Sequence, residues 1–217
     1  MKIDDLLSYA IPVFLANVCF AILTQVDLIL VRHYFPPTEV GIYASAAVLG
    51  RAIMYLPASL ILALFHMVAE AHVREQKSYH LLAKASAYTV VLAGSGTLLY
   101  ILFPRFIMGL LFGEKYLKAA SVLGLYGFAM LPMALLLILI NYNLGRTRVK
   151  FIKYLSLYTC LQVFLIVLFH QTLTQILWII LACGTVSVMT ILFCPIMESH
   201  SLRSAIGHLI YKGQNNR

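Results

Sequence analysis

Two ionisable side chains, Asp27 and Arg51, lie inside long apolar stretches of the sequence. Arg51 follows Gly41 by ten positions. On a helix that rises about 1.5 Å per residue it therefore lies about 15 Å further along the axis, near the middle of a bilayer core about 30 Å thick. A charge at that depth costs about 2.5 to 3.5 kcal/mol on insertion scales, and Asp27 is the nearest candidate in the membrane to offset this cost. We therefore expect the two residues to form an ion pair.

Such a pair admits two interpretations. One is a structural contact within a helix bundle, and the other is a polar cavity in which Arg51 meets an anionic substrate group. Asn17, Gln25 and Tyr55 belong to the same two apolar stretches and would extend a polar surface. The predicted substrate-binding residues are thus Arg51, Asp27, Asn17, Gln25 and Tyr55.

Patterns that would indicate catalysis or metal binding are weak. His66 and Glu70 are four positions apart, but no third ligand is evident, so a hydrogen bond at the membrane interface is favoured over a metal site or a proton relay. Residues 94–96 (GSG) lack the rest of a nucleophile elbow, and no P-loop or dinucleotide fingerprint occurs. The sequence predicts a protein that is not an enzyme and that uses no metal and no cofactor.

The composition favours a membrane protein. Hydrophobic residues make up 62% of the chain and charged residues 11%, whereas a soluble domain carries about 25% charged residues. The formal net charge is +8, but Lys and Arg lie in short segments between apolar runs, where they orient a protein in the membrane. Nucleic-acid binding is therefore not expected. The four cysteines show no CxxC pairing and are interpreted as buried thiols.

Apolar runs of about 20 residues predict an all-α, polytopic membrane bundle of about six transmembrane helices. The predicted spans are 6–31, 40–69, 80–103, 119–142, 151–170 and 173–195. Residues 1–197 would form this six-helix lobe, and residues 198–217 a cytoplasmic tail that is amphipathic or flexible. Basic residues gather after the second, fourth and sixth spans, so both termini are expected on the cytoplasmic side of the inner membrane.

Several short segments follow one another with the spacing of a known family. In chain order they are residues 27–35 (DLILVRHYF), 39–44 (EVGIYA), 48–51 (VLGR), 55–57 (YLP), 112–119 (FGEKYLKA) and 145–148 (GRTR). By their order and spacing, roughly residues 6–150 resemble the polysaccharide-exporter branch of the multidrug/oligosaccharidyl-lipid/polysaccharide (MOP) superfamily. The last two predicted helices agree with that branch in hydropathy more than in motif.

The resemblance implies a flippase that moves lipid-linked oligosaccharides or polysaccharide precursors to the outer leaflet by alternating access, with Arg51 contacting the diphosphate of the carrier lipid. Members of the family usually have two six-helix lobes around a central cavity, and this chain has enough spans for one. A second lobe would come from a parallel homodimer or a separate chain, unless the chain is a truncated product. The expected partners are the lipid-linked substrate, membrane lipids and that second lobe.

Three alternatives stay open. The drug and toxin antiporter branch of the same superfamily would favour carboxylates over arginine in the cavity, because its substrates are cationic. A membrane enzyme of lipid-linked sugar metabolism would need clusters of Asp, Glu or His at a membrane face, which only His66 and Glu70 approach. A non-transporting interaction subunit would be supported if Arg51 were sealed against other helices.

Overall fold

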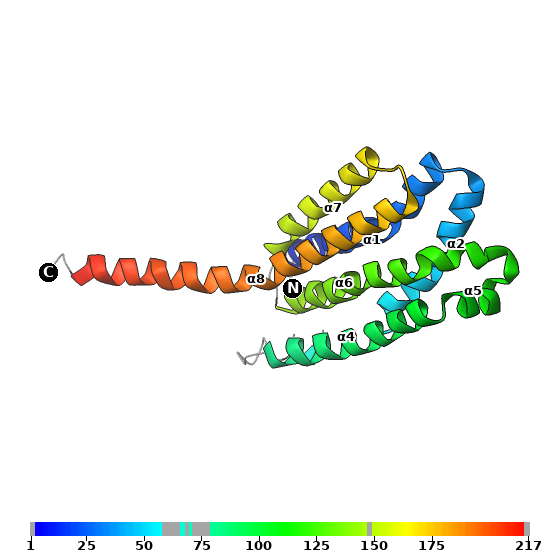
Figure 1. Ribbon diagram of the computed structural model, residues 1–217. Coiled ribbons are helices and arrows are strands. Elements are labelled where there is room, and N and C mark those ends of the chain that lie inside the picture. Colours follow the sequence, from blue (N-terminus) through cyan, green and yellow to red (C-terminus); the bar gives the residue numbers. More distant parts are fainter. Residues whose placement is uncertain (1–2, 58–65, 68–69, 71–78, 147–148, 215–217) are drawn as a thin grey trace.

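The computed structural model describes residues 3–57, 66–67, 70, 79–146 and 149–214, and this part of the chain is all-α (Figure 1). It contains seven α-helices and one 3₁₀ helix. Their bounds are α1 Ile3–Tyr34, α2 Pro37–Tyr55, α4 Tyr79–Leu102, α5 Pro104–Phe112, the 3₁₀ helix η1 Glu114–Ala119, α6 Ala120–Gly145, α7 Phe151–Leu168 and α8 Leu173–Gln214.

Five helical segments in the described residues are long and apolar enough to cross a membrane. They are Ala10–Tyr34, His80–Leu102, Glu114–Gly145, Phe151–Leu168 and Leu173–Phe193. The chain therefore has the helical composition of a multi-pass membrane protein, and five of the six predicted spans coincide with these segments. The last of them continues without a break as α8, which projects well past the bundle in Figure 1.

The remaining predicted span, 40–69, is not one continuous helix. In the described residues α2 ends at Tyr55, and Leu56 and Pro57 form a turn. The Leu56 amide donates to the carbonyls of Ala52 and Ile53, which tightens the last turn of α2, and Pro57 has no N–H with which to continue the ladder. The second half of this predicted span lies largely on residues 58–65 and 68–69, outside the described part of the chain.

A short helix follows α4, in the segment between the predicted spans 80–103 and 119–142. Pro104 begins α5 at a position where its missing N–H is no loss, and Gly113, at φ 80°, ends it. Within α5, Met108 is fully buried while Phe106 and Leu110 are 68% and 72% exposed. A short helix with a large apolar exposed face is typical of a segment that lies in the membrane interface.

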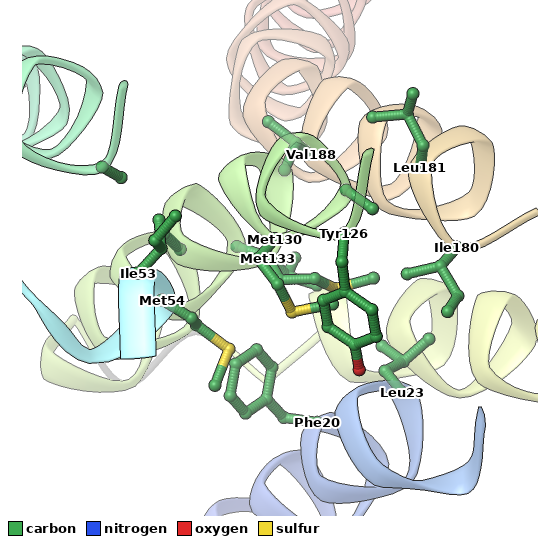
Figure 2. Packing of buried hydrophobic residues seen from close by; sticks show 14 of the residues in the cluster. Phe20, Leu23, Ile53, Met54, Tyr126, Met130, Met133, Ile180, Leu181 and Val188 are labelled. Carbon is green, nitrogen blue, oxygen red and sulfur yellow. The ribbon is translucent and has the colours of Figure 1, made fainter. Parts of the chain in front are cut away.

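Helix α6 is the centre of the bundle. It packs against α2, α4 and α8, while α1 packs mainly against α7, which in turn contacts α8. In Figure 1 the α1–α2, α4–α6 and α7–α8 connections lie at one end of the bundle, and the N-terminus lies toward the other. Figure 2 shows how methionines fill the space around α6: Met54 lies beside the ring of Phe20, and Met130 and Met133 lie next to Tyr126. Flexible thioethers suit such irregular gaps between helices.

The interface between α1 and α7 contains a buried glutamine with one unsatisfied atom. Gln162 Nε2 donates to the Leu23 carbonyl at 2.8 Å, whereas Gln162 Oε1 is buried and has no hydrogen-bond partner among the described residues. An unsatisfied buried acceptor costs about 1 to 3 kcal/mol, which offsets the net gain of about 1 kcal/mol from the bond that is made.

We expect Gln162→Met to leave the free energy of unfolding unchanged or to raise it by about 1 kcal/mol, because the change keeps the volume and removes the unsatisfied oxygen. Thermal unfolding of the purified protein in one detergent measures this. Gln175→Met is the matched control: Gln175 Oε1 accepts from the amides of Gln171 and Thr172, so losing it should lower stability. A clear loss of stability in Gln162→Met would show that its Oε1 has a partner such as water.

Candidate functional site

The buried carboxylate of Asp27 binds three donors from two other helices. Asp27 is 1% exposed, and its Oδ1 accepts from Arg51 Nη2 at 2.9 Å. Its Oδ2 accepts from the hydroxyls of Tyr43 at 2.8 Å and Tyr126 at 2.6 Å. The expected ion pair between Asp27 and Arg51 is confirmed. We call these four residues the Asp27 cluster.

The antiparallel arrangement of α1 and α2 brings Tyr43 and Arg51 to the same carboxylate. Tyr43 and Arg51 are eight residues apart on α2, which is about 12 Å along the helix axis. Both side chains are long, so they reach Asp27 from different heights on α2. Tyr126 comes from α6, and its ring meets that of Tyr43 edge-on, with centroids 5.4 Å apart. Edge-on packing of this kind fixes the direction of both hydroxyls.

Gly50 makes room for Tyr126 beside α2. A Cβ atom on Gly50 would lie 2.0 Å from Tyr126 Cδ1, a distance that real Cβ atoms do not adopt. The absence of a side chain at position 50 therefore allows the tyrosine ring to lie against the α2 backbone. Figure 2 shows the Tyr126 hydroxyl directed toward α1, where Leu23 lies one turn before Asp27.

Arg51 forms an ion pair with Asp27 but has further N–H donors that this contact does not satisfy. Its side chain is 13% exposed, and among the described residues Asp27 is its hydrogen-bond partner, through one nitrogen. The Nε atom of Arg51 is buried and has no acceptor in the described part of the chain. A guanidinium carries five N–H donors. The group therefore retains donor capacity beyond its bond to Asp27.

The three other predicted site residues lie away from the Asp27 cluster. Asn17 is exposed and donates to the Val13 carbonyl of its own helix at 2.8 Å. Gln25 is exposed, and Tyr55 is 51% exposed at the end of α2. Within the described residues none of the three hydrogen-bonds to the Asp27 cluster, so the structure brings together only Asp27 and Arg51 of the predicted set.

Sequence reasoning missed Tyr43, Tyr126 and Gly50. Tyrosines in apolar runs also anchor helices at the membrane interface, so residue type alone did not mark Tyr43 and Tyr126 as members of a buried cluster. Gly50 was recognisable as a packing residue, since it follows Ala46 by four positions, the spacing that lets helices approach closely in lipid. Its neighbour Tyr126 is 76 positions away in the sequence, and no local pattern connects the two.

No group of three or more His, Cys, Asp or Glu residues that could hold a metal ion occurs among the described residues. His66 and Glu70 both lie exposed. The Asp27 cluster itself holds an ion pair and two further hydrogen bonds among apolar helices.

Comparison with known proteins finds no match to this chain among protein-family models, curated proteins or solved structures. What the chain does is therefore inferred from the Asp27 cluster and the arrangement of the helices.

Proposed function

We propose that this chain is one lobe of a carrier that moves lipid-linked oligosaccharide or polysaccharide precursors across the inner membrane by alternating access. In this proposal Arg51 contacts the phosphate groups of the carrier lipid. The observation that carries it is the Asp27 cluster: a cation held deep in an apolar bundle, by a carboxylate that has two further donors of its own.

The two tyrosines allow Arg51 to change partners. If Arg51 turns toward an anionic substrate, Asp27 keeps the hydrogen bonds from Tyr43 and Tyr126, so the carboxylate is not left without donors. A buried ion pair that breaks without such compensation costs about 3 to 5 kcal/mol. The cluster lowers this cost, and a site that binds and releases a charged substrate needs a small difference between its two states.

The face of α2 next to Arg51 is open to a partner. Val48 and Tyr55 on this face are 60% and 51% exposed, and Ala52 is exposed as well. Positions 48, 51, 52 and 55 are neighbours on one side of a helix. A second lobe that covers this face, from another copy of the chain or from a separate protein, would enclose a cavity with Arg51 at its wall. The distribution of basic residues would place both termini in the cytoplasm.

The proposal is tested by replacing Arg51 in the native host and measuring surface glycan. Arg51→Ala is expected to reduce export by about ten-fold or more, the effect of losing about 1.4 kcal/mol of binding, while the amount of folded protein in the membrane stays near normal. Arg51→Lys should retain part of the activity because it keeps the charge but loses the planar fork. Lys153→Ala, which removes an exposed cation from α7, is the matched control. Normal export in Arg51→Ala with normal abundance would contradict the proposal.

A non-transporting interaction subunit is the second candidate, because Arg51 is already neutralised by Asp27 and largely enclosed. That role predicts that export fails only when folded protein is lost from the membrane. Labelling at position 51 separates the two functions. Cys160 is exposed, contrary to its interpretation from sequence as a buried thiol, so the test needs a background without native cysteines. In that background Arg51→Cys should react with a water-soluble thiol reagent if it faces a cavity, and should stay unreactive if it faces only protein. The antiporter alternative receives less support, since three donors already bind the buried Asp27 carboxylate, which leaves it little capacity to bind a cation.

A further inference from the structure

A cleft of about 730 Å³ opens at the end of the bundle where α4 connects to α6. We call it the rim cleft. Its lining includes Pro104 and Arg105 from α5, Lys118 and Ser121 around the start of α6, Ile42 of α2 and Leu173 of α8. Two cationic side chains line it, and no acidic residue does so in the described part of the chain.

The electrostatics of the rim cleft favour an anion. Neither Arg105 nor Lys118 forms an ion pair with a carboxylate in the described residues, so both charges are available. Pro104 and Arg105 begin α5, and the positive end of that helix dipole adds to the two cations. Ser121 is already used, because its hydroxyl donates to the Lys118 carbonyl at 2.8 Å. The two side-chain cations are thus the main attraction for a ligand.

An apolar groove of about 400 Å³ continues from the rim cleft between α4 and α6. The two cavities share Pro104, Ala120 and Ser121 in their linings. Further along, the groove is lined by Ile101, Gly124 and Phe128, among others. Ile101 and Phe128 are 53% and 45% exposed, so the groove is open on the side that faces hydrocarbon.

Gly124 gives this groove its depth. A Cβ atom at Gly124 would lie 3.2 Å from Ile101 Cγ1 and 3.6 Å from the Ile101 Cα, so α4 and α6 approach closely at this level. A close approach of two helices leaves a furrow along their outer side, and an extended hydrocarbon chain fits such a furrow. The furrow and the two cations together match one amphiphile, with its charged group at the bundle end and its chain along the spans.

We propose that the rim cleft and the adjoining groove bind an anionic phospholipid of the membrane, with the phosphate-bearing head group between Arg105 and Lys118 and one acyl chain between α4 and α6. The occupant is a membrane lipid because the groove opens sideways toward hydrocarbon, where phospholipid is abundant. None of the lining residues belongs to the Asp27 cluster. This inference therefore does not depend on the proposed transport function.

Native mass spectrometry of the full chain with defined lipids tests the proposal. The protein should retain phosphatidylglycerol in preference to phosphatidylcholine. Arg105→Ala/Lys118→Ala should reduce this preference by about ten-fold or more, because each cation near an anionic head group contributes about 1 kcal/mol. Lys115→Ala is the matched control, since Lys115 is an exposed lysine on the same 3₁₀ helix that does not line the rim cleft. An equal loss in Lys115→Ala would show only a general effect of surface charge and would overturn the site.

A separate variant tests the groove between α4 and α6. Ser121→Phe places a large ring where the two cavities meet, on an exposed residue, and should weaken retention of both lipids without changing their ratio. Unchanged retention in this variant would overturn the acyl-chain part of the proposal.

Two competitors identify the source of the phosphate. If inorganic phosphate at low millimolar concentration or a polyprenyl diphosphate at equimolar concentration displaces phosphatidylglycerol, the site is not one for membrane phospholipid.

Discussion

Asp27→Leu is expected to destabilise the protein by about 3 kcal/mol, twice as much as Arg51→Leu, although both changes break the same ion pair. Asp27→Leu leaves a guanidinium that cannot lose its proton, and it removes the acceptor that Tyr43 and Tyr126 share. Arg51 is 13% exposed and can turn toward water, so the loss falls at the lower end of the range for a broken buried pair.

Arg51→Leu should cost only about 1 to 2 kcal/mol, because Asp27 retains the two hydroxyl donors of Tyr43 and Tyr126. The quantity to measure is the free energy of unfolding of each purified variant in the same detergent, with size-exclusion profiles to confirm that the compared proteins are folded. The expected asymmetry comes from the chemistry of the two groups and not from the contact that they share.

The double variant Asp27→Leu/Arg51→Leu serves as the control. It should recover about 2 kcal/mol relative to Asp27→Leu, since it no longer contains a stranded charge, and it should retain only the deficit of the two tyrosine hydroxyls. Strictly additive effects of the two single variants would mean that Asp27 and Arg51 are not coupled. The ion pair would then have no role in stability or in the proposed exchange of partners.

The pairing of Asp27 with Arg51 could be predicted because charges are sparse in the apolar runs, which leaves each with few candidate partners. The positions of Asn17 and Gln25 could not be predicted in the same way. Both belong to the apolar run that contains Asp27, but this does not determine which face of the helix they occupy. Residues two apart do not share a helix face, so Gln25 cannot lie beside Asp27. Tyr55 is four residues after Arg51, but it stays on the exposed face of α2 while Arg51 reaches inward.

Hydropathy located five of the spans because a long apolar run has few other structures open to it in a membrane. It failed at α5 and at the end of α2, where backbone chemistry at Pro104, Gly113 and Pro57 decides the structure. Three pairs of small residues four positions apart, Ala46/Gly50, Ala83/Ala87 and Ala120/Gly124, have the spacing that lets helices approach closely in lipid, and they show a similar limit. Gly124 and Gly50 lie at helix contacts as their spacing indicates, whereas Ala83 and Ala87 are both exposed. Spacing shows that a close approach is possible, and the partner helix decides whether it occurs.

Gly50→Ala should destabilise the protein by about 3 kcal/mol, which is a large effect for one methyl group. The added Cβ overlaps the ring of Tyr126, and overpacking of this kind costs about 1 to 3 kcal/mol. Moving the ring also breaks the 2.6 Å hydrogen bond from Tyr126 to Asp27, and a bond to a charged group contributes about 1.5 to 3 kcal/mol. Unfolding in detergent measures the sum.

Gly41→Ala on the same helix is the matched control, because its Cβ would lie at an ordinary 3.9 Å from Tyr116 and alanine favours a helix by about 1 kcal/mol over glycine. It should be neutral or stabilising. Tyr126→Leu gives the second comparison: in its presence Gly50→Ala should cost at least about 1 kcal/mol less, since the ring that it meets is gone. If Gly50→Ala is as stable as Gly41→Ala, the Tyr126 ring does not lie against α2. That result would also contradict the hydrogen bond from Tyr126 to Asp27.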